Sequence, residues 1–319
     1  MDRRCFRCVE AGKGGVLGVK TRCSATRRVF FRAEATGCLG RNYQGFTRFE
    51  IKEQILKVSV VIPTFNAERY ITATIESVLN QSHQDFEILV VDDCSTDNTV
   101  KYIREIMLSD SRINLIELDD NTGGPATPRN TGIKNASGEW LAFLDADDLW
   151  SPEKLSVQLT IAKECNVDFL CSKTYDFKGD KSSYVNEYCG NKFRTKTLNF
   201  RSLLFKNVIP TSSVLVRRDI IAKYNFNRDK GYVAVEDYAL WLELARDNIR
   251  MIKILSPLIA YRILPGSISR GKLKQARKVA RVITKALQKE NKLLTLFMPV
   301  LFLSYIVQSI YFRLLKKAM

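Results

Sequence analysis

The sequence predicts an α/β fold with a doubly wound, mostly parallel sheet, followed by a basic and apolar helical tail. Short apolar segments that are typical of buried strands alternate with segments whose apolar residues recur at helical spacing. Two of the strand segments end in aspartates, at the edge where ligands bind in open parallel sheets. The first three strand segments are residues 58–62, 88–91 and 113–118. This alternation indicates parallel strands joined by crossover helices.

The intervening helices are predicted from their apolar faces and from polar residues suited to begin them. Asn66 is expected to cap the first helix, and Ser95 or Thr96 the second, while Pro63 stops the first strand. The apolar residues on one side of these helices are Ile71, Ile75, Val78, Leu79, Val100, Ile103 and Ile106. Farther along we expect a helix over 155–162, a strand over 167–175, a polar loop over 178–196 and a strand over 211–216.

A further apolar segment, residues 140–144, runs directly into three carboxylates, Asp145, Asp147 and Asp148. Because removing an anion from water is costly, acids at the end of a buried strand need a cation nearby. Oxygen ligands at this spacing suit Mg²⁺ or Mn²⁺, and these ions suit a diphosphate. The alternative is that the acids cap the next helix, for which residues 151–153 form a good start. Both interpretations can hold together.

Asp92 and Asp93 follow the strand over 88–91, so they are expected at the same edge of the sheet as the acids at 145–148. Acidic ends on two strands of one sheet indicate a site rather than a helix cap. Arg129, on a short helix before the acidic strand, is placed to meet a diphosphate. The glycine loop over 121–130 lacks the spacing and position of a dinucleotide fingerprint, which argues against a nicotinamide or flavin enzyme.

The net charge of +16 allows nucleic acid, anionic lipid or phosphorylated substrates as partners. The basic residues gather at the two ends of the chain, and no nucleic-acid recognition motif accompanies them, so no nucleic acid is expected. The single histidine, His83, excludes multi-histidine metal sites and argues against a catalytic Ser-His or Cys-His pair. Residues 1–56 are basic and show no strand or helix period, which predicts a disordered extension.

Four segments carry a family resemblance: residues 58–66 (VSVVIPTFN), 90–97 (VVDDCSTD), 129–132 (RNTG) and 143–148 (FLDADD). In this order they resemble the signatures of family 2 inverting glycosyltransferases, which have the GT-A nucleotide-diphospho-sugar transferase fold. The resemblance covers roughly residues 58–268, and it is specific because several motifs recur at the family's spacing. It implies a nucleotide-sugar donor, taken here as a UDP-sugar.

The resemblance also implies roles for single residues. Pro63, Phe65 and Asp93 would hold the base and ribose of the donor, with Asp93 accepting a hydrogen bond from the base. Asp145 would lie in the donor site and bind the metal ion together with Asp147, and Asp148 lies beside them in the metal-binding group. Cys94 stands where the family most often has glycine, a departure that affects the backbone of the turn rather than the chemistry.

A helix beginning near residue 235 carries Glu236 and Asp237 in its first turn and buries Leu240, Trp241 and Leu244. Acids at a helix N-terminus are also explained by the helix dipole alone. The resemblance implies that Asp237 is the general base, which takes the proton of the acceptor hydroxyl. Arg129 and the loop over 261–270, which also resembles a family feature, are then expected to meet the leaving diphosphate.

The tail begins with a basic helix over 271–292, with Leu273, Ala276, Val279, Ala280 and Ile283 along one side. The run over 293–312 contains no charge and is long enough to cross a bilayer. We expect the tail to lie on an anionic membrane surface, at the cytoplasmic face of the plasma membrane. A single span and packing against a partner are the alternatives. The chain then divides into an extension (1–56), a transferase domain (57–270) and a membrane-associating tail (271–319).

The leading hypothesis is a metal-dependent inverting glycosyltransferase that extends a glycan or lipid-linked acceptor of a bacterial surface polysaccharide, such as lipopolysaccharide, capsule or exopolysaccharide. A sugar-phosphate nucleotidyltransferase is a second hypothesis, but it would need a glycine-rich loop with a lysine after the first strand, which residues 63–66 do not supply. A non-catalytic module that binds lipid or nucleic acid through its basic ends is the third. It predicts that Asp145, Asp147 and Asp237 are dispensable.

Overall fold

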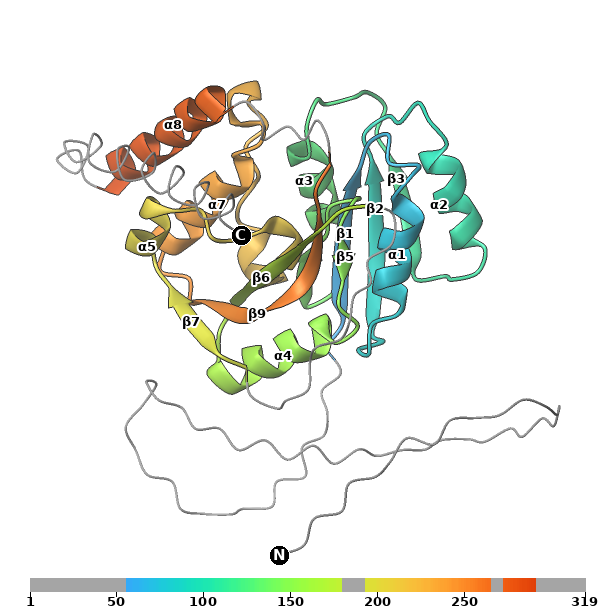
Figure 1. The fold of residues 1–319 in the computed structure, drawn as a ribbon, viewed down its shortest axis with the longest axis horizontal. Coiled ribbons are helices and arrows are strands. Elements are labelled where there is room, and N and C mark those ends of the chain that lie inside the picture. The colour runs from blue at the N-terminus through green and yellow to red at the C-terminus, as the bar shows by residue number, and fades with distance from the viewer. Residues whose placement is uncertain (1–55, 180–192, 265–271, 291–319) are drawn as a thin grey trace, which may run out of the picture. The chain divides into compact units, whose positions relative to one another are not determined.

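The computed structural model describes residues 56–179, 193–264 and 272–290 (Figure 1). Within them the strands form one nine-stranded sheet in the order β3-β2-β1-β4-β8-β6-β9-β5, with β7 pairing to β9. The strands are β1 (Val58–Thr64), β2 (Phe86–Asp92), β3 (Ile113–Glu117), β4 (Trp140–Phe143), β5 (Leu149–Trp150), β6 (Phe169–Phe177), β7 (Thr195–Leu198), β8 (Leu215–Arg217) and β9 (Met251–Arg262). The helices are α1 (Ile71–Leu79), α2 (Thr99–Met107), α3 (Ala126–Asn135), α4 (Lys154–Cys165), α5 (Phe200–Phe205), α6 (Arg218–Ile221), α7 (Glu236–Arg246) and α8 (Lys272–Glu290), with 3-10 turns η1 (Thr211–Ser213) and η2 (Lys230–Tyr232).

The central part of the sheet is parallel, as predicted. Strand β1 pairs in parallel with β2 on one side and with β4 on the other, and β3 extends the parallel set beyond β2. Strand β8 is antiparallel to both β4 and β6, so β6 and its parallel neighbour β9 again run in the direction of β4. The chain order reverses between β1 and β4. At such a switch point the carboxyl ends of the strands leave a crevice for ligands.

Two hydrophobic cores cover the two faces of this sheet. In β1, Val58, Val60 and Ile62 contact one core, and Val61 contacts the other, because successive side chains of a strand point to opposite faces. Helices α1 and α4 contribute to the first core, and α3, α7 and α8 to the second. The sheet is therefore buried on both faces, which explains why its central strands read as continuous apolar runs.

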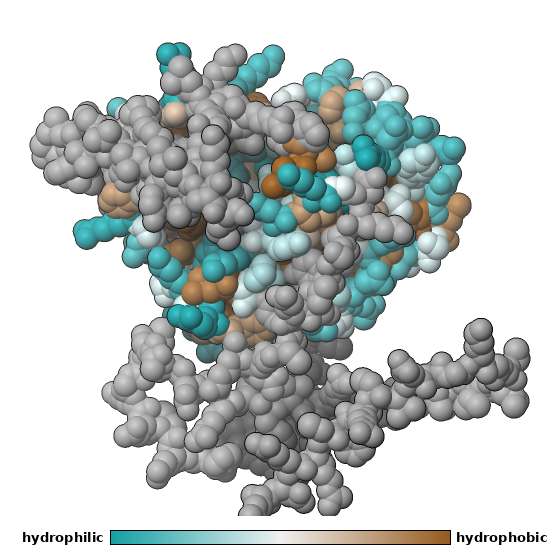
Figure 2. Space-filling view, in the orientation of Figure 1, coloured by the Kyte–Doolittle hydropathy of each residue, from teal (hydrophilic) through white to brown (hydrophobic). Residues whose placement is uncertain are grey.

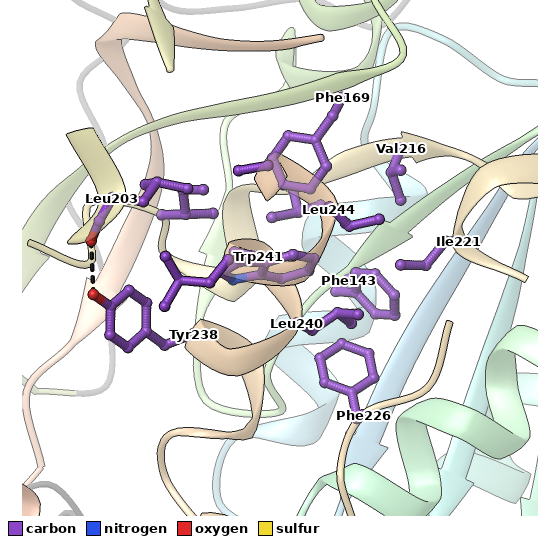
Figure 3. Close-up of a cluster of buried hydrophobic side chains, with 14 of the residues drawn as sticks. Phe143, Phe169, Leu203, Val216, Ile221, Phe226, Tyr238, Leu240, Trp241 and Leu244 are labelled. Carbon is purple, nitrogen blue, oxygen red and sulfur yellow. Dashed lines mark hydrogen bonds between the residues drawn. The ribbon is translucent and has the colours of Figure 1, made fainter. Parts of the chain in front are cut away.

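The second core is built around Trp241 of α7, which lies among aromatic side chains from three other segments (Figure 3). Its ring centroid is 5.1 Å from that of Phe169 and 5.8 Å from that of Phe226, both in edge-to-face geometry. The hydroxyl of Tyr238 donates a 2.6 Å hydrogen bond to the Leu203 carbonyl. These contacts hold the buried side of α7 firmly, so the first turn of the helix has a defined position.

A glycine in α3 brings that helix close to the sheet. A Cβ atom at Gly132 would lie 2.3 Å from a methyl carbon of Val61, closer than any real contact allows. Only glycine therefore lets α3 approach β1 this closely. The close approach places Arg129, one turn earlier on α3, at the crevice between β1 and β4.

The predicted helix caps were wrong, although the helices themselves are present. Asn66 has a left-handed backbone (φ 47°), and its side-chain oxygen accepts a 2.8 Å hydrogen bond from the Thr96 amide. The Asn66 amide donates to the Ser95 hydroxyl. All of these residues thus tie the loop after β1 to the loop after β2, and α1 begins only at Ile71. Asn66, Ser95 and Thr96 were expected to bond to the helix that follows each of them, but they bond instead to each other across the two loops.

Three other boundaries differ from the prediction. Of the strand expected over 211–216 only the end lies in β8, because residues 211–213 form the 3-10 turn η1. The first strand continues through Pro63 to Thr64, since Pro63 lies beyond the last residue of β4 and pairs only with Val91 of β2. The polar segment over 178–196 was predicted to be a loop, but its end enters β7, which pairs with β9. Residues 180–192 lie outside the described part. The exposed side of β7 carries polar residues, which gave the segment the composition of a loop.

The basic helix of the tail is present as α8, but its apolar side contacts the domain. Val279, Val282, Ile283 and Leu287 are each at most 5% exposed and belong to the second core with α7. These side chains are not available to lipid, contrary to the expectation for this part of the tail. Among the described residues, no helix combines the length and apolar character that a bilayer span needs. The uncharged run over 293–312 and the extension over 1–55 lie outside the described residues.

Candidate active site

The predicted site residues gather at the carboxyl ends of β1, β2 and β4. Pro63 is the second-last residue of β1 and is buried. The side chain of Phe65, just beyond the strand, is 49% exposed. Asp93 follows β2 and is 3% exposed. Its Oδ1 accepts hydrogen bonds from the Thr122 amide (2.9 Å) and hydroxyl (2.8 Å). No described residue donates to its Oδ2, so one oxygen of Asp93 is left to accept a bond from a ligand.

The neighbouring Asp92 has a different task. Both of its carboxylate oxygens accept hydrogen bonds from Ser95, one from the hydroxyl (2.5 Å) and one from the amide (2.8 Å). Between them Cys94 has a left-handed backbone with φ 64°. A glycine adopts this conformation at no steric cost, whereas cysteine does not. The departure from the family pattern is therefore a matter of backbone geometry, and the Asp92–Ser95 bonds maintain the turn.

Two of the three carboxylates of the acid loop, residues 145–148, are partly exposed. Asp145 has a side chain that is 33% exposed, and Asp147 is partly buried. Asp148 is fully buried, and its oxygens accept bonds from the Ser212 hydroxyl (2.6 Å) and the Arg262 amide (3.0 Å). Asp148 therefore anchors the loop. Its place in the metal-binding group stays a prediction.

The charges of the acid loop suit a divalent cation. Burial raises the pKa of Asp147 to about 6, and the Asp145 carboxylate adds to the rise. A cation between these two carboxylates would relieve their repulsion. The described residues contain no cluster of three acidic, histidine or cysteine side chains arranged for a metal. Mg²⁺ and Mn²⁺, however, are commonly held by one or two carboxylates together with substrate phosphates and water. Asp145 and Asp147 fit that requirement.

Arg129 lies in the site but faces carboxylates. It is 4% exposed, and it donates from Nη2 to Asp145 (2.7 Å) and from Nη1 to Glu236 (2.9 Å). Burial alone would lower the pKa of Arg129, but these carboxylates raise it above its usual range. The guanidinium also lies over the ring of Phe226, at 5.3 Å. A diphosphate contact was predicted for Arg129, and the structure instead makes it a buried link between the acid loop and α7.

Asp237 occupies the first turn of α7, as predicted, and its side chain is partly exposed. The Thr211 hydroxyl donates to its Oδ2 at 2.9 Å, and the Tyr238 amide donates to its Oδ1 at 2.6 Å. Burial raises the pKa of Asp237 to about 6, the Glu236 carboxylate adds to the rise, and Arg129 opposes it. A carboxylate with this pKa is basic enough to take a proton near neutral pH.

Several residues that shape the site were not predicted from the sequence. The side-chain amide of Asn130 exchanges two 2.8 Å hydrogen bonds with the backbone of Phe226, which fixes the ring below Arg129. Arg262 was expected to meet a diphosphate, but it is 3% exposed and donates from Nε to the Asp147 carbonyl at 2.8 Å. Residues 265–270 of the same predicted loop lie outside the described part. The only feature of the sequence that could have indicated a structural role for Asn130 is its position within the 129–132 motif.

The chain matches the model of the family described as glycosyl transferase family 2 over residues 59–224. The chain belongs to glycosyltransferase family 2. One family member, named UDP-Glc:alpha-D-GlcNAc-diphosphoundecaprenol beta-1,3-glucosyltransferase WfgD, from Escherichia coli, is 35% identical over 69% of this chain and 83% of its own length. The putative teichuronic acid biosynthesis glycosyltransferase TuaG of Bacillus subtilis is 31% identical over 69% of this chain and 84% of its own length.

Solved structures of similar fold include two glycosyltransferases. Staphylococcus aureus TarS, residues 1–349, in complex with UDP-GlcNAc superimposes with a TM-score of 0.59 at 24% identity, over 73% of this chain and 66% of that chain. The mannosyltransferase PcManGT from Pyrobaculum calidifontis, in complex with GDP-Man and Mn²⁺, gives a TM-score of 0.53 at 18% identity, over 78% of this chain and 73% of that chain. They show that this family 2 enzyme has the GT-A fold. The predicted fold and transferase class are thus confirmed, and the two alternatives are set aside.

Proposed function

We propose that this family 2 glycosyltransferase moves a sugar from a UDP-sugar to a hydroxyl of a lipid-linked saccharide, with inversion at the anomeric carbon. The names of WfgD and TuaG support an acceptor of this kind and a role in surface polysaccharide synthesis. The UDP-GlcNAc complex of TarS supports a UDP-sugar as the donor class. The identity of the sugar is left to experiment, because it depends on the shape of the pocket.

One observation carries the proposal: a continuous ionic chain joins the donor side of the site to the acceptor side. Asp145 of the acid loop pairs with Arg129, and Arg129 pairs with Glu236, the residue next to Asp237. The Arg129 and Glu236 side chains are at most 5% exposed. Buried charges in this arrangement are costly to separate, so the distance between the acid loop and Asp237 is held constant. A fixed distance between a leaving-group site and a base is what in-line displacement requires.

The reaction then follows from the residues of this chain. Asp237, held by Thr211, takes the proton of the acceptor hydroxyl as its oxygen forms a bond to the anomeric carbon. The bond between that carbon and the diphosphate oxygen breaks at the opposite face, which inverts the centre. Asp93 holds the base through its free oxygen, and Phe65 covers it. Asp145 and Asp147 would hold a divalent cation, which when bound supplies positive charge against the leaving diphosphate.

The first experiment is a thermal-shift screen of the full-length chain with UDP, GDP and a panel of nucleotide sugars, each with and without Mn²⁺. We expect UDP and one UDP-sugar to raise the melting temperature in the presence of Mn²⁺, because only the folded state binds them. The active donor is then incubated with a synthetic saccharide-diphospholipid, and the product linkage is determined by NMR. Release of UDP without acceptor measures hydrolysis. Binding of GDP but not UDP, or release of UDP that does not depend on acceptor, would contradict the proposal.

We also propose that residues 271–319 bring the enzyme to an anionic membrane surface. The exposed residues Arg277, Arg281 and Lys285 recur at a spacing of four along α8, so they form one basic ridge. The face shown in Figure 2 carries only small hydrophobic patches among hydrophilic residues where it is described. Because the apolar side of α8 is buried in the second core, the proposed attachment of α8 is electrostatic, at about 1 kcal/mol per basic residue near an anionic leaflet.

Vesicle sedimentation tests this attachment. The full-length chain should bind vesicles that contain anionic phospholipid more strongly than neutral ones, and the triple variant Arg277→Gln, Arg281→Gln, Lys285→Gln should lose that difference at low salt. A truncation for this assay should follow residue 290, because α8 contributes to the hydrophobic core. Equal binding by the triple variant and the wild type would show that the ridge does not make the contact.

A further inference from the structure

Helix α8 lies outside the segment that matches the family, yet it contacts the turn from which the acidic residues of α7 emerge. The turn comprises residues 229–235, between η2 and α7. Two α8 side chains reach it: Lys278 donates from Nζ to the Val233 carbonyl at 2.7 Å, and Gln275 donates from Nε2 to the Ala234 carbonyl at 2.8 Å. Both donors are partly buried. They satisfy successive carbonyls immediately before the helix that carries Asp237.

The residue between these bonds has an unusual backbone. Ala234 has φ 70°, in the left-handed region that residues with a Cβ seldom adopt. Such a conformation is sterically unfavourable and persists only where the surroundings maintain it. Val235, the next residue, is the N-cap of α7, and its side chain makes no capping hydrogen bond. The start of α7 therefore relies on contacts from outside the helix.

Further contacts from α8 reach the same turn. Lys285 lies over the ring of Tyr232, at 5.0 Å from its centroid. A Cβ atom at Gly231 would come within 2.4 Å of the Arg281 guanidinium, so the backbone of the turn lies close against α8. At the other end of α7, Lys289 pairs with Glu243 at 2.9 Å. Helix α8 thus contacts both the turn before α7 and α7 itself.

We propose that Gln275 and Lys278 are positioning residues for the transfer reaction, which hold the strained turn at Val233 and Ala234 and so place Asp237 against the acceptor hydroxyl. This inference rests on the proposed role of Asp237. Asp237 lies three residues after Ala234, so relaxation of the turn displaces the first turn of α7. A displacement of about 1 Å at a catalytic group is sufficient to reduce turnover by roughly 10²-fold. The donor site is built from β1, β2 and the acid loop, and α8 does not touch it in the described structure.

The test separates turnover from donor binding. In Lys278→Met the side chain keeps its apolar length but loses the donor, and in Gln275→Glu the donor becomes an acceptor that faces the Ala234 carbonyl. We expect kcat to fall about tenfold in each, with the KM for the UDP-sugar and the Kd for UDP unchanged. Lys278→Arg keeps a donor and should retain most of the wild-type kcat. Gln288→Glu, on the exposed side of α8, is the matched control and should behave as wild type.

A second arm addresses the strain directly. Glycine adopts the left-handed conformation without steric cost, so Ala234→Gly should restore part of the kcat lost in Lys278→Met. No recovery in this double variant would overturn the proposal. Loss of UDP binding together with turnover in both Lys278→Met and Gln275→Glu would also overturn it, because α8 would then merely hold the domain together.

The outcomes also distinguish this inference from the proposed function. If Asp237→Asn transfers sugar as well as the wild type, the proposed role of Asp237 is wrong and the inference fails with it. If Asp237→Asn is inactive while Lys278→Met and Gln275→Glu match the Gln288→Glu control, the proposed function stands and only the positioning role of α8 is refuted.

Discussion

The acid loop after β4 and the first turn of α7 both place neighbouring carboxylates at the site, but only some of them are open to a ligand. In the acid loop Asp148 is fully buried with both oxygens bonded, while Asp145 and Asp147 are partly exposed. In α7 Glu236 is buried in an ion pair, while Asp237 is partly exposed. Each region thus divides its acids into one that is buried and bonded to other segments and others that are partly exposed.

Neighbouring acids of one motif therefore have different roles in these two regions. The buried acid binds groups from other parts of the chain and thereby sets the position of its neighbour. The pair after β2 differs, because both acids are buried. Asp92 accepts two bonds from the nearby Ser95, whereas Asp93 accepts two from the distant Thr122 through one oxygen and keeps the other free. In the acid loop and in α7, hydrogen-bond donors from distant segments decide which acid is free, and substitutions of these acids test that division.

The largest effect is expected for Asp147→Asn. The substitution keeps the shape but removes the charge that would hold a cation, so transfer should fall by roughly 10³-fold or more, equivalent to several kcal/mol of lost charge stabilisation. The melting temperature should fall little, because among the described residues the Asp147 carboxylate accepts a hydrogen bond only from its own backbone amide. Transfer assays and thermal denaturation measure both. Turnover near the wild-type rate, in this variant or in excess chelator, would refute a metal role for the acid loop.

The second largest effect is expected at Asp237, the partly exposed acid of α7. Asp237→Asn cannot accept a proton, so kcat should fall by roughly 10²-fold or more while the Kd for UDP stays the same. Asp247→Asn, an exposed acid at the other end of α7, is the matched control and should leave kcat unchanged. Isothermal titration with UDP and steady-state kinetics provide the two quantities. If UDP binding collapses while turnover at saturation survives, Asp237 belongs to the donor pocket.

The pH dependence gives a third, smaller effect. The pKa of Asp237 is raised to about 6, and the base acts only when it is deprotonated. The rate should therefore fall about tenfold per pH unit below pH 6 and level off above it. The raised pKa also means that the folded state binds the Asp237 proton more tightly than the unfolded chain does. Asp237 therefore adds to the free energy of unfolding below the ordinary aspartate pKa, and this contribution is lost as the pH rises through about 6. A kcat profile that is flat down to pH 5 would contradict the assignment.

The smallest effect on turnover is expected for Asp148→Asn, the same change one residue from Asp147. The amide oxygen still accepts from the Arg262 amide, and the amide nitrogen can donate to the Ser212 hydroxyl oxygen. Transfer should stay within about tenfold of the wild type, the range typical of changes to supporting residues. Direct Mn²⁺ titration of both asparagine variants is the comparison. Equal losses of Mn²⁺ affinity at 147 and 148 would return Asp148 to the metal-binding group.

Strands β1, β2, β3, β4 and β6, the order of the motifs and the helix that carries Asp237 could be predicted from the sequence, whereas β5, β7 and β9 were not predicted. The apolar period of a strand or helix is a local property. A buried parallel strand that ends in acids can therefore be recognised from about ten consecutive residues. The helix of α7 was predicted with its buried residues Leu240, Trp241 and Leu244, and all three are at most 2% exposed. The turn at Cys94 was also interpreted correctly, because the departure from glycine occurs within a recognisable motif.

What only the tertiary structure decided is which charged groups meet. Arg129 was predicted to meet a diphosphate, but its partners Asp145 and Glu236 lie 16 and 107 residues away in the chain. The loops that pair Asn66 with Thr96, and the packing that turns the apolar side of α8 towards α7, are equally non-local. A charge lowers its free energy with whichever partner the fold brings within hydrogen-bond distance, and burial makes that choice strict. The pattern of residues therefore determined where the acids lie, and the packing of distant segments determined which of them remain free to act.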